Sequence, residues 1–92
     1  MIKTFKSKAL AALWNKGDAS KLPPEQVARI KARLSQLDCA MQPEDMNVPG
    51  YFFHALTGDR VGSYSVRVNG NWRITFQWEG QDAIAVDHED YH

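Results

Sequence analysis

Two arginines stand close together in residues 63–78, where apolar residues occupy most even positions and polar residues most odd ones. This alternation predicts two β-strands joined at Asn69-Gly70, because Asn-Gly between alternating segments is the strongest short signal for a hairpin. For both strands to bury their even residues in one core, the hairpin needs a three-residue loop or a Gly bulge. Arg67 and Arg73 then lie on one polar face, opposite each other or a diagonal step apart.

Like charges in that position cost stability, so the hairpin suggests an anion that both guanidinium groups share. Phosphate is the natural candidate, because guanidinium binds it through paired hydrogen bonds. Residues 34–92 contain three basic residues against nine acidic ones, and all three are arginines: Arg60, Arg67 and Arg73. The exclusive use of arginine favours bidentate recognition over general solvation. A chance use of arginine is the alternative, since only three residues are concerned.

Groups that can transfer protons gather at the end of the chain. Residues 87–92, Asp-His-Glu-Asp-Tyr-His, contain two histidines, a tyrosine and three acids directly after a predicted strand. His54 is a further histidine in an apolar segment, where a hydrogen-bonded structural role is commoner than catalysis. Arginines with these groups suit metal-free RNA cleavage, in which a base deprotonates the ribose 2′-hydroxyl, cations stabilise the phosphorane and an acid protonates the leaving oxygen. DNA lacks that hydroxyl, so this chemistry selects RNA.

Several other chemistries lack their usual motifs. The sequence has no glycine-rich phosphate loop, no Cys-x-x-C pair and no Gly-x-Ser-x-Gly elbow, and His88-x-x-x-His92 follows a strand rather than lying on a helix. We therefore expect no metal and no cofactor. The single cysteine, Cys39, and the absence of a visible signal peptide or membrane span predict a cytoplasmic protein.

The length of 92 residues predicts a single domain, residues 1–92, with one core. The composition, 43% hydrophobic and 24% charged, is that of a globular protein. The expected fold is α+β: an N-terminal strand and two helices on one face of a mostly antiparallel sheet of about four to five strands. The expected elements are an edge strand at 1–6, a helix from its N-cap Ser7 to Gly17, a helix opened by Pro24, a surface loop at 41–50, a central or covered strand at 51–56, the hairpin, and a strand at 83–86.

The net charge of zero argues against a strong nonspecific grip on nucleic acid, but the charges are unevenly distributed. Residues 1–33 hold eight basic residues against two acidic ones. The basic face of the second helix is either a solvated surface or a contact to RNA backbone or an acidic partner. Arg60 has the alternative of an ordinary salt bridge to Asp59 or to a C-terminal acid. The candidate RNA or ribosome contacts are Lys3, Lys6, Lys8, Arg29, Lys31, Arg33 and Arg60.

Four segments together resemble the HigB toxins, plasmid-maintenance killer proteins of the RelE/ParE superfamily. They are residues 56–60 (Leu-Thr-Gly-Asp-Arg), 64–69 (Tyr-Ser-Val-Arg-Val-Asn), 72–76 (Trp-Arg-Ile-Thr-Phe) and the terminal Asp-Tyr-His. The likeness covers nearly the whole chain. It implies a RelE-like fold and a small bacterial toxin that enters the A site of the 70S ribosome and cuts translated mRNA. It also implies a HigA-like helix-turn-helix antitoxin, through which alone the toxin contacts operator DNA.

Carried over residue by residue, the resemblance implies a catalytic pocket formed by His54, Arg67, Arg73, Asp90, Tyr91 and His92. The arginines would hold the scissile phosphate, the histidines and the aspartate would share proton transfer, and the tyrosine would orient or stack a base. Two other functions stay open. One is a ParE-like protein that binds and poisons DNA gyrase, and the other is a noncatalytic RNA- or protein-binding module with the same fold.

Overall fold

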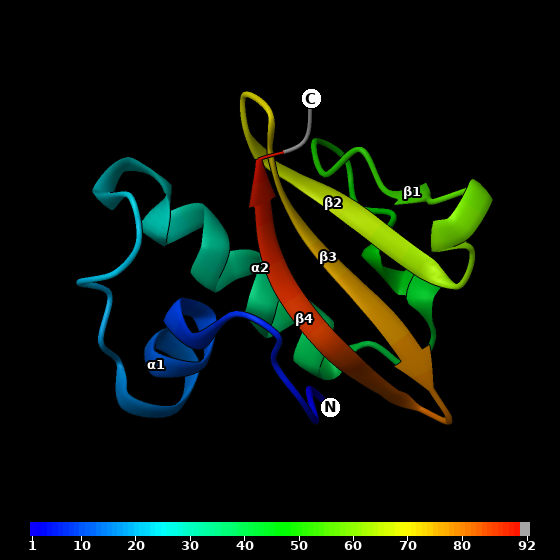
Figure 1. The fold of residues 1–92 in the computed structure, drawn as a ribbon, viewed down its shortest axis with the longest axis horizontal. Coiled ribbons are helices and arrows are strands. Elements are labelled where there is room, and N and C mark those ends of the chain that lie inside the picture. The colour runs from blue at the N-terminus through cyan, green and yellow to red at the C-terminus, as the bar shows by residue number, and fades with distance from the viewer. Residues whose placement is uncertain (91–92) are drawn as a thin grey trace.

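The computed structural model of the chain describes residues 1–90. Two helices lie on one side of an antiparallel sheet with strand order β1-β2-β3-β4 (Figure 1). The elements are α1 (Lys8–Lys16), α2 (Val27–Cys39), β1 (His54–Ala55), β2 (Ser63–Asn69), β3 (Trp72–Glu79) and β4 (Asp82–Asp90). The predicted α+β class is confirmed. No helix within the described residues is long and apolar enough to cross a bilayer.

Both ends of α1 are set by local signals. The Ser7 hydroxyl accepts a hydrogen bond from the backbone N–H of Leu10 at 3.1 Å, which satisfies a donor of the first turn. Gly17 ends the helix in the left-handed conformation, with φ of 71°. The predicted bounds of this helix are therefore confirmed.

The core lies between the helices and one face of the sheet. A short 3-10 turn, Pro24–Gln26, leads into α2, whose Ile30, Leu34 and Leu37 are fully buried. These side chains recur at helical spacing, so they form one apolar stripe against the sheet. The facing residues of the sheet are Val66, Val68, Ile74, Phe76, Ala83 and Val86.

The β2–β3 hairpin has the register that burial of the even residues requires. Val66 pairs with Ile74, and Arg67 pairs directly with Arg73. The register then shifts at Val68, and a two-residue turn closes the hairpin. The predicted even-with-even pairing is confirmed. The bulge, however, lies at a valine in the strand rather than at a glycine, and the loop is shorter than three residues.

The last strand is longer than predicted, because β4 continues from Asp82 to Asp90 instead of ending at Val86. A register shift opposite β3, with Ala85 at a φ of 51°, allows both Ala83 and Val86 to face the core. Residues 87–90, which were expected to follow the last strand, are therefore part of it and pair with β3.

The N-terminal segment runs along β4 (Figure 1). It forms two isolated parallel bridges, Ile2 to Ala83 and Phe5 to Val86, rather than the continuous edge strand expected at residues 1–6. Thr4, between them, accepts a hydrogen bond from the N–H of Ala85 at 2.8 Å. The bulge in β4 leaves the N–H of Ala85 unpaired with β3, and the Thr4 hydroxyl supplies its acceptor.

The prediction of a central or covered strand at residues 51–56 is wrong. Only His54 and Ala55 form a strand, β1, which lies at the edge of the sheet with both residues exposed. Phe52 interrupts the extended run with a φ of 50°. The segment 41–50, predicted to be a surface loop, is partly buried, because its 3-10 turn Pro43–Met46 places Met46 fully in the core.

His88 faces the helices rather than the polar side of the sheet. Its ring stacks on Trp72 with centroids 4.4 Å apart, and its Nε2–H donates to Oε1 of the buried Gln26 at 2.9 Å. Burial lowers the pKa of His88, and the nearby Asp87 only partly offsets that effect.

Stability should therefore fall in mildly acidic solution. Below the unfolded-state pKa of about 6.5 the unfolded chain binds a proton that folded His88 resists, so acid favours unfolding. His88→Phe keeps a ring against Trp72 and removes this titration, at a pH-independent cost of about 1–3 kcal/mol for the unpaired Gln26. We expect urea denaturation between pH 7.5 and 5 to give a flatter profile for this variant than for the wild type. Parallel profiles would contradict the assignment.

Candidate active site

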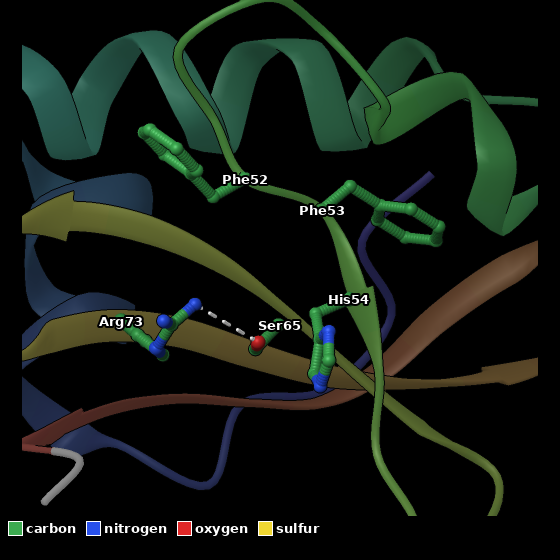
Figure 2. A pocket seen from close by; sticks show the side chains of 5 residues that line it. All are labelled: Phe52, Phe53, His54, Ser65 and Arg73. Atoms are coloured by element: carbon green, nitrogen blue, oxygen red, sulfur yellow. Dashed lines mark hydrogen bonds between the residues drawn. The ribbon is translucent and has the colours of Figure 1, made fainter.

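A cavity of about 310 Å³ opens between the strip of residues 52–54 and the polar face of the sheet (Figure 2). It is lined by Phe52, Phe53, His54, Ser65 and Arg73. The strip contributes from one side, β2 contributes Ser65 and β3 contributes Arg73. The cavity thus brings together two of the predicted catalytic residues, His54 and Arg73.

Ser65 lies between these two residues. It pairs with His54 across β1 and β2, and its hydroxyl accepts a hydrogen bond from Nη1 of Arg73 at 3.4 Å (Figure 2). Ser65 is almost fully buried, so this contact helps to orient the guanidinium. The alternation of the hairpin places Ser65 on the same face as Arg67 and Arg73, and this alternation is the one signal in the sequence that points to Ser65. The cavity combines a cation for an anionic ligand with an imidazole for proton transfer.

Arg67 occupies an adjoining cavity although it is paired with Arg73 in the sheet. This second cavity, of about 380 Å³, is also lined by Phe52 and by two arginines of α2. Nε of Arg67 donates to the carbonyl of Gly70 at 3.2 Å, and its guanidinium lies 5.3 Å from the centre of the Phe52 ring. The two arginines of the hairpin therefore open onto neighbouring cavities that share one aromatic wall.

Phe52 combines an exposed ring with an unusual backbone. Its side chain is 62% exposed, and its positive φ costs on the order of 1–2 kcal/mol for a residue with a Cβ. The chain is held on both sides of it, because Tyr51 accepts a backbone hydrogen bond from Arg67 and His54 pairs with Ser65. An exposed ring held at the mouth of a cavity can stack on a nucleobase. No signal in the sequence indicated this conformation.

A carboxylate, Glu89, stands opposite Arg73 in β4 but is bound by other groups. Nη1 and Nη2 of Arg60 donate to its two oxygens at 2.9 and 2.8 Å, and the Thr75 hydroxyl donates to one of them. Hydrogen bonds from Arg60 lower the pKa of Glu89 most; burial opposes them and Thr75 reinforces them. Arg60 thus makes the salt bridge to a C-terminal acid that was the alternative to an RNA contact.

The end of the described chain lies beside the hairpin (Figure 1). Asp90, the last described residue, is exposed and pairs with Trp72, one position from Arg73. Strand alternation places Asp90 on the face of Trp72 rather than on that of Arg73. The two other predicted catalytic residues, Tyr91 and His92, lie outside the described residues.

The remaining predicted RNA contacts are distributed over different parts of the molecule. Lys3 lies on the N-terminal segment with its Nζ 3.5 Å from a carboxylate oxygen of Asp82. Lys6 lies near the ion pair of Arg60 in a small hollow, and Lys8 lies on α1. None of these three lysines lines the cavity of Arg73 or that of Arg67.

On α2 the three predicted contacts separate into two groups. Lys31 is exposed and lines neither cavity, whereas Arg29 and Arg33 line the cavity of Arg67. Nη1 of Arg29 donates to the carbonyl of Val68 at 3.2 Å, and Nε of Arg33 donates to that of Arg67 at 2.8 Å. The carbonyls of Arg67 and Val68 lie at the bulge of β2, where the pairing with β3 is interrupted. The two arginines of α2 donate the hydrogen bonds that β3 does not supply there.

Two helices against a four-stranded antiparallel sheet, with an arginine and a histidine in a cleft on its polar side, are the fold and the site that the resemblance to RelE-like toxins implied. Residues 3–92 match the family of RelE-like HigB toxins of type II toxin-antitoxin systems, and the chain belongs to this family. It is 46% identical over 92 residues to Endoribonuclease HigB of Proteus vulgaris, covering 100% of both chains. It is 34% identical over 85 residues to Toxin HigB-1 of Vibrio cholerae serotype O1, covering 90% of this chain and 87% of that one.

The resemblance seen in the sequence is therefore confirmed, and the chain is a homologue of an endoribonuclease. A toxin of a type II system has a cognate antitoxin, so one protein partner follows from the family.

The ion pair of Glu89 predicts a loss of stability at acidic pH, separate from that of His88. Because the folded-state pKa of Glu89 is lowered, its stabilisation is present above the unfolded-state pKa of about 4.3 and is lost as pH falls through the folded value. Glu89→Gln should lower the free energy of unfolding by about 1 kcal/mol at pH 7. We expect the difference from wild type in urea denaturation to be smaller at pH 3.

The matched control is Glu79→Gln, which removes an exposed carboxylate from the end of β3. It should change stability by less than about 0.5 kcal/mol at pH 7. Equal losses in the Glu89 and Glu79 variants would contradict a specific role of the Arg60 pair.

Proposed function

We propose that the chain is a ribosome-dependent endoribonuclease that cuts mRNA in the A site during translation. The observation that carries this proposal is the cavity in which the Arg73 guanidinium and the His54 imidazole flank Ser65. An exposed cleft with an aromatic rim suits an extended RNA strand, because single strands are bound by cationic grooves with stacking platforms. Full-length similarity to a protein named as an endoribonuclease supports RNA as the substrate.

The cleavage uses only groups that a protein of this composition supplies. A base removes the proton of the ribose 2′-hydroxyl, and the O2′ attacks the adjacent phosphorus. The bond from phosphorus to O5′ breaks, an acid protonates the leaving O5′, and the products are a 2′,3′-cyclic phosphate and a 5′-hydroxyl. Arg73 binds the phosphate and stabilises the charge that develops on the phosphorane, helped by Arg67 from the adjoining cavity. His54 transfers a proton at O2′ or O5′.

The C-terminal residues complete this proposed site. Asp90 pairs with the neighbour of Arg73 in β3, and the two residues that follow it add a reach of at most about 7 Å. His92 shares proton transfer with His54, and Tyr91 orients or stacks a base. Asp90, which lies on the face of Trp72, places these two residues beside Arg73. This assignment is supported by the place of Tyr91 and His92 in the chain, directly after a strand that ends beside Arg73.

The partners follow from the same proposal. The substrate is mRNA on the 70S ribosome, which places the activity in the cytoplasm, and the reaction requires no cofactor. The cognate partner is a HigA-like antitoxin with a helix-turn-helix domain, and operator DNA is contacted only through it. Residues 1–92 act as one toxin domain.

A translation reaction tests the proposal directly. The purified protein should cut a message that ribosomes are translating and leave the same naked message intact, as detected by primer extension. Cleavage in neither sample would contradict the enzymatic function, and equal cleavage in both would contradict ribosome dependence. DNA damage signalling on expression, with messages intact, would indicate a gyrase poison instead.

Substitution of Arg73 should remove most of the activity. Loss of a cation that stabilises transition-state charge costs about 10²–10³ in rate, so Arg73→Ala should cut translated mRNA that much more slowly while keeping its fold by circular dichroism. Lys16→Ala is the control, because Lys16 lies at the end of α1 and lines neither cavity. Full activity of Arg73→Ala protein would exclude Arg73 from this role.

Removal of the last residue tests the C-terminal part of the site. A chain ending at Tyr91 should lose about 10²–10⁴ in cleavage rate, the usual contribution of a general acid or base, and should keep the thermal stability of the full chain. An unchanged rate would show that His92 takes no part in proton transfer.

A further inference from the structure

The second cavity has the features of an anion site of its own. Arg29 and Arg33 come from α2 and Arg67 comes from β2, and the three guanidinium groups line one cavity of about 380 Å³ with Gly50, Phe52 and Val68. None of the three arginines has an ion pair with a carboxylate of the described residues. We refer to this cavity as the arginine pocket.

Gathering these charges is unfavourable in the unliganded protein. Arg29 and Arg33 are four positions apart on α2, where like charges destabilise a helix. Burial lowers the pKa of Arg33 most; the nearby Tyr51 opposes that effect, and the charge of Arg29 lowers the pKa further. A ligand with negative charge would relieve this repulsion.

Structural hydrogen bonds use only part of each guanidinium. Arg29 and Arg67 each donate one bond to a backbone carbonyl. Arg33 donates two, from Nε to the carbonyl of Arg67 and from Nη1 to the carbonyl of Arg29. Each planar fork has further N–H groups, so all three arginines keep donors for a ligand.

Two of these guanidinium groups lie over aromatic rings. The guanidinium carbon of Arg33 is 4.2 Å from the centre of the Tyr51 ring, and that of Arg67 is 5.3 Å from the centre of the Phe52 ring. Stacking on a ring face leaves the edge of a guanidinium able to bind a tetrahedral anion. The pocket is therefore ordered before any ligand arrives, which lowers the entropic cost of binding.

We propose that the arginine pocket binds a second phosphate of the substrate RNA, the one next to the phosphate held at Arg73. Because Arg67 and Arg73 are direct partners in the sheet and Phe52 lines both cavities, a strand that crosses Phe52 reaches both arginines. The second phosphate then fixes the direction and register of the strand at the cleavage site. This inference rests on the proposed function and adds a subsite to it.

The salt dependence of binding measures this contact. The probe is a fluorescein-labelled RNA hexanucleotide with 2′-O-methyl groups, which cannot be cut, titrated by anisotropy at several salt concentrations. Each phosphate contact to a single strand contributes about 0.7 to the slope of log Kd against log salt concentration. Arg29→Gln should reduce that slope by about 0.7, and Arg29→Lys should keep the slope but weaken binding, because it keeps the charge and loses the fork.

Lys21→Gln provides the matched control. Lys21 is an exposed residue of the turn after α1 and does not line the arginine pocket, so its loss removes the same charge at another place. It should leave the slope unchanged. Equal slopes for wild type, Arg29→Gln and Lys21→Gln would overturn the inference.

Three further outcomes separate this inference from the proposed function. A reduced slope in Arg29→Gln, with no cleavage of translated mRNA by the wild type, would support the subsite and contradict the nuclease. Normal cleavage with an unchanged slope and KM in Arg29→Gln would overturn the subsite alone. An unchanged slope with weaker binding either to ribosomes that lack mRNA or to the antitoxin would assign the pocket to that partner and overturn the inference.

Discussion

The pairing register of the β2–β3 hairpin is the constraint on which the rest of the structure depends. Burial of the even residues on the helix side puts Arg67 and Arg73 together on the other face, and the observed register pairs them directly despite their repulsion. The bulge at Val68 interrupts the ladder beside this pair, and α2 supplies the missing donors through Arg29 and Arg33. The register of the hairpin therefore determines which residues enter the core, where α2 contacts the hairpin and where the arginines gather.

Local charge, rather than net charge, decides what this surface can bind. The chain is neutral overall, but the one acid opposite Arg73, Glu89, has both oxygens bound by Arg60. Its charge is therefore largely compensated within the sheet. The two cavities consequently expose arginines, although the total charge of the protein would not attract RNA. Recognition of RNA therefore depends on the positions of these guanidinium groups and not on the net charge.

The candidate site is open because the strand beside it is short. Phe52 leaves the extended conformation just before His54, so β1 pairs through only two residues at the sheet edge. Residues 52–54 therefore line the cavity of Arg73 instead of forming a longer strand paired with β2, and Phe52 also lines the cavity of Arg67. Backbone strain of this kind persists where the surroundings hold it, and here it orients an exposed ring between two cationic cavities.

The sequence by itself determined the features that depend on near neighbours: the caps of α1 at Ser7 and Gly17, the apolar stripe of α2, and the placement of Arg67 and Arg73 on one face of the hairpin. That the two arginines pair directly was decided by the register in the structure. The residue types of 87–92 indicated proton-transfer chemistry, and resemblance to a family singled out the terminal Asp-Tyr-His among them; periodicity selected neither. Only the tertiary structure decided that β1 lies at an edge and which charged side chains meet. The α2 arginines and the hairpin are separated by more than 30 residues, as Arg29 is from Val68, so their meeting depends on how the layers pack. Local propensity and alternation carry no information about that packing, because they describe only neighbours along the chain.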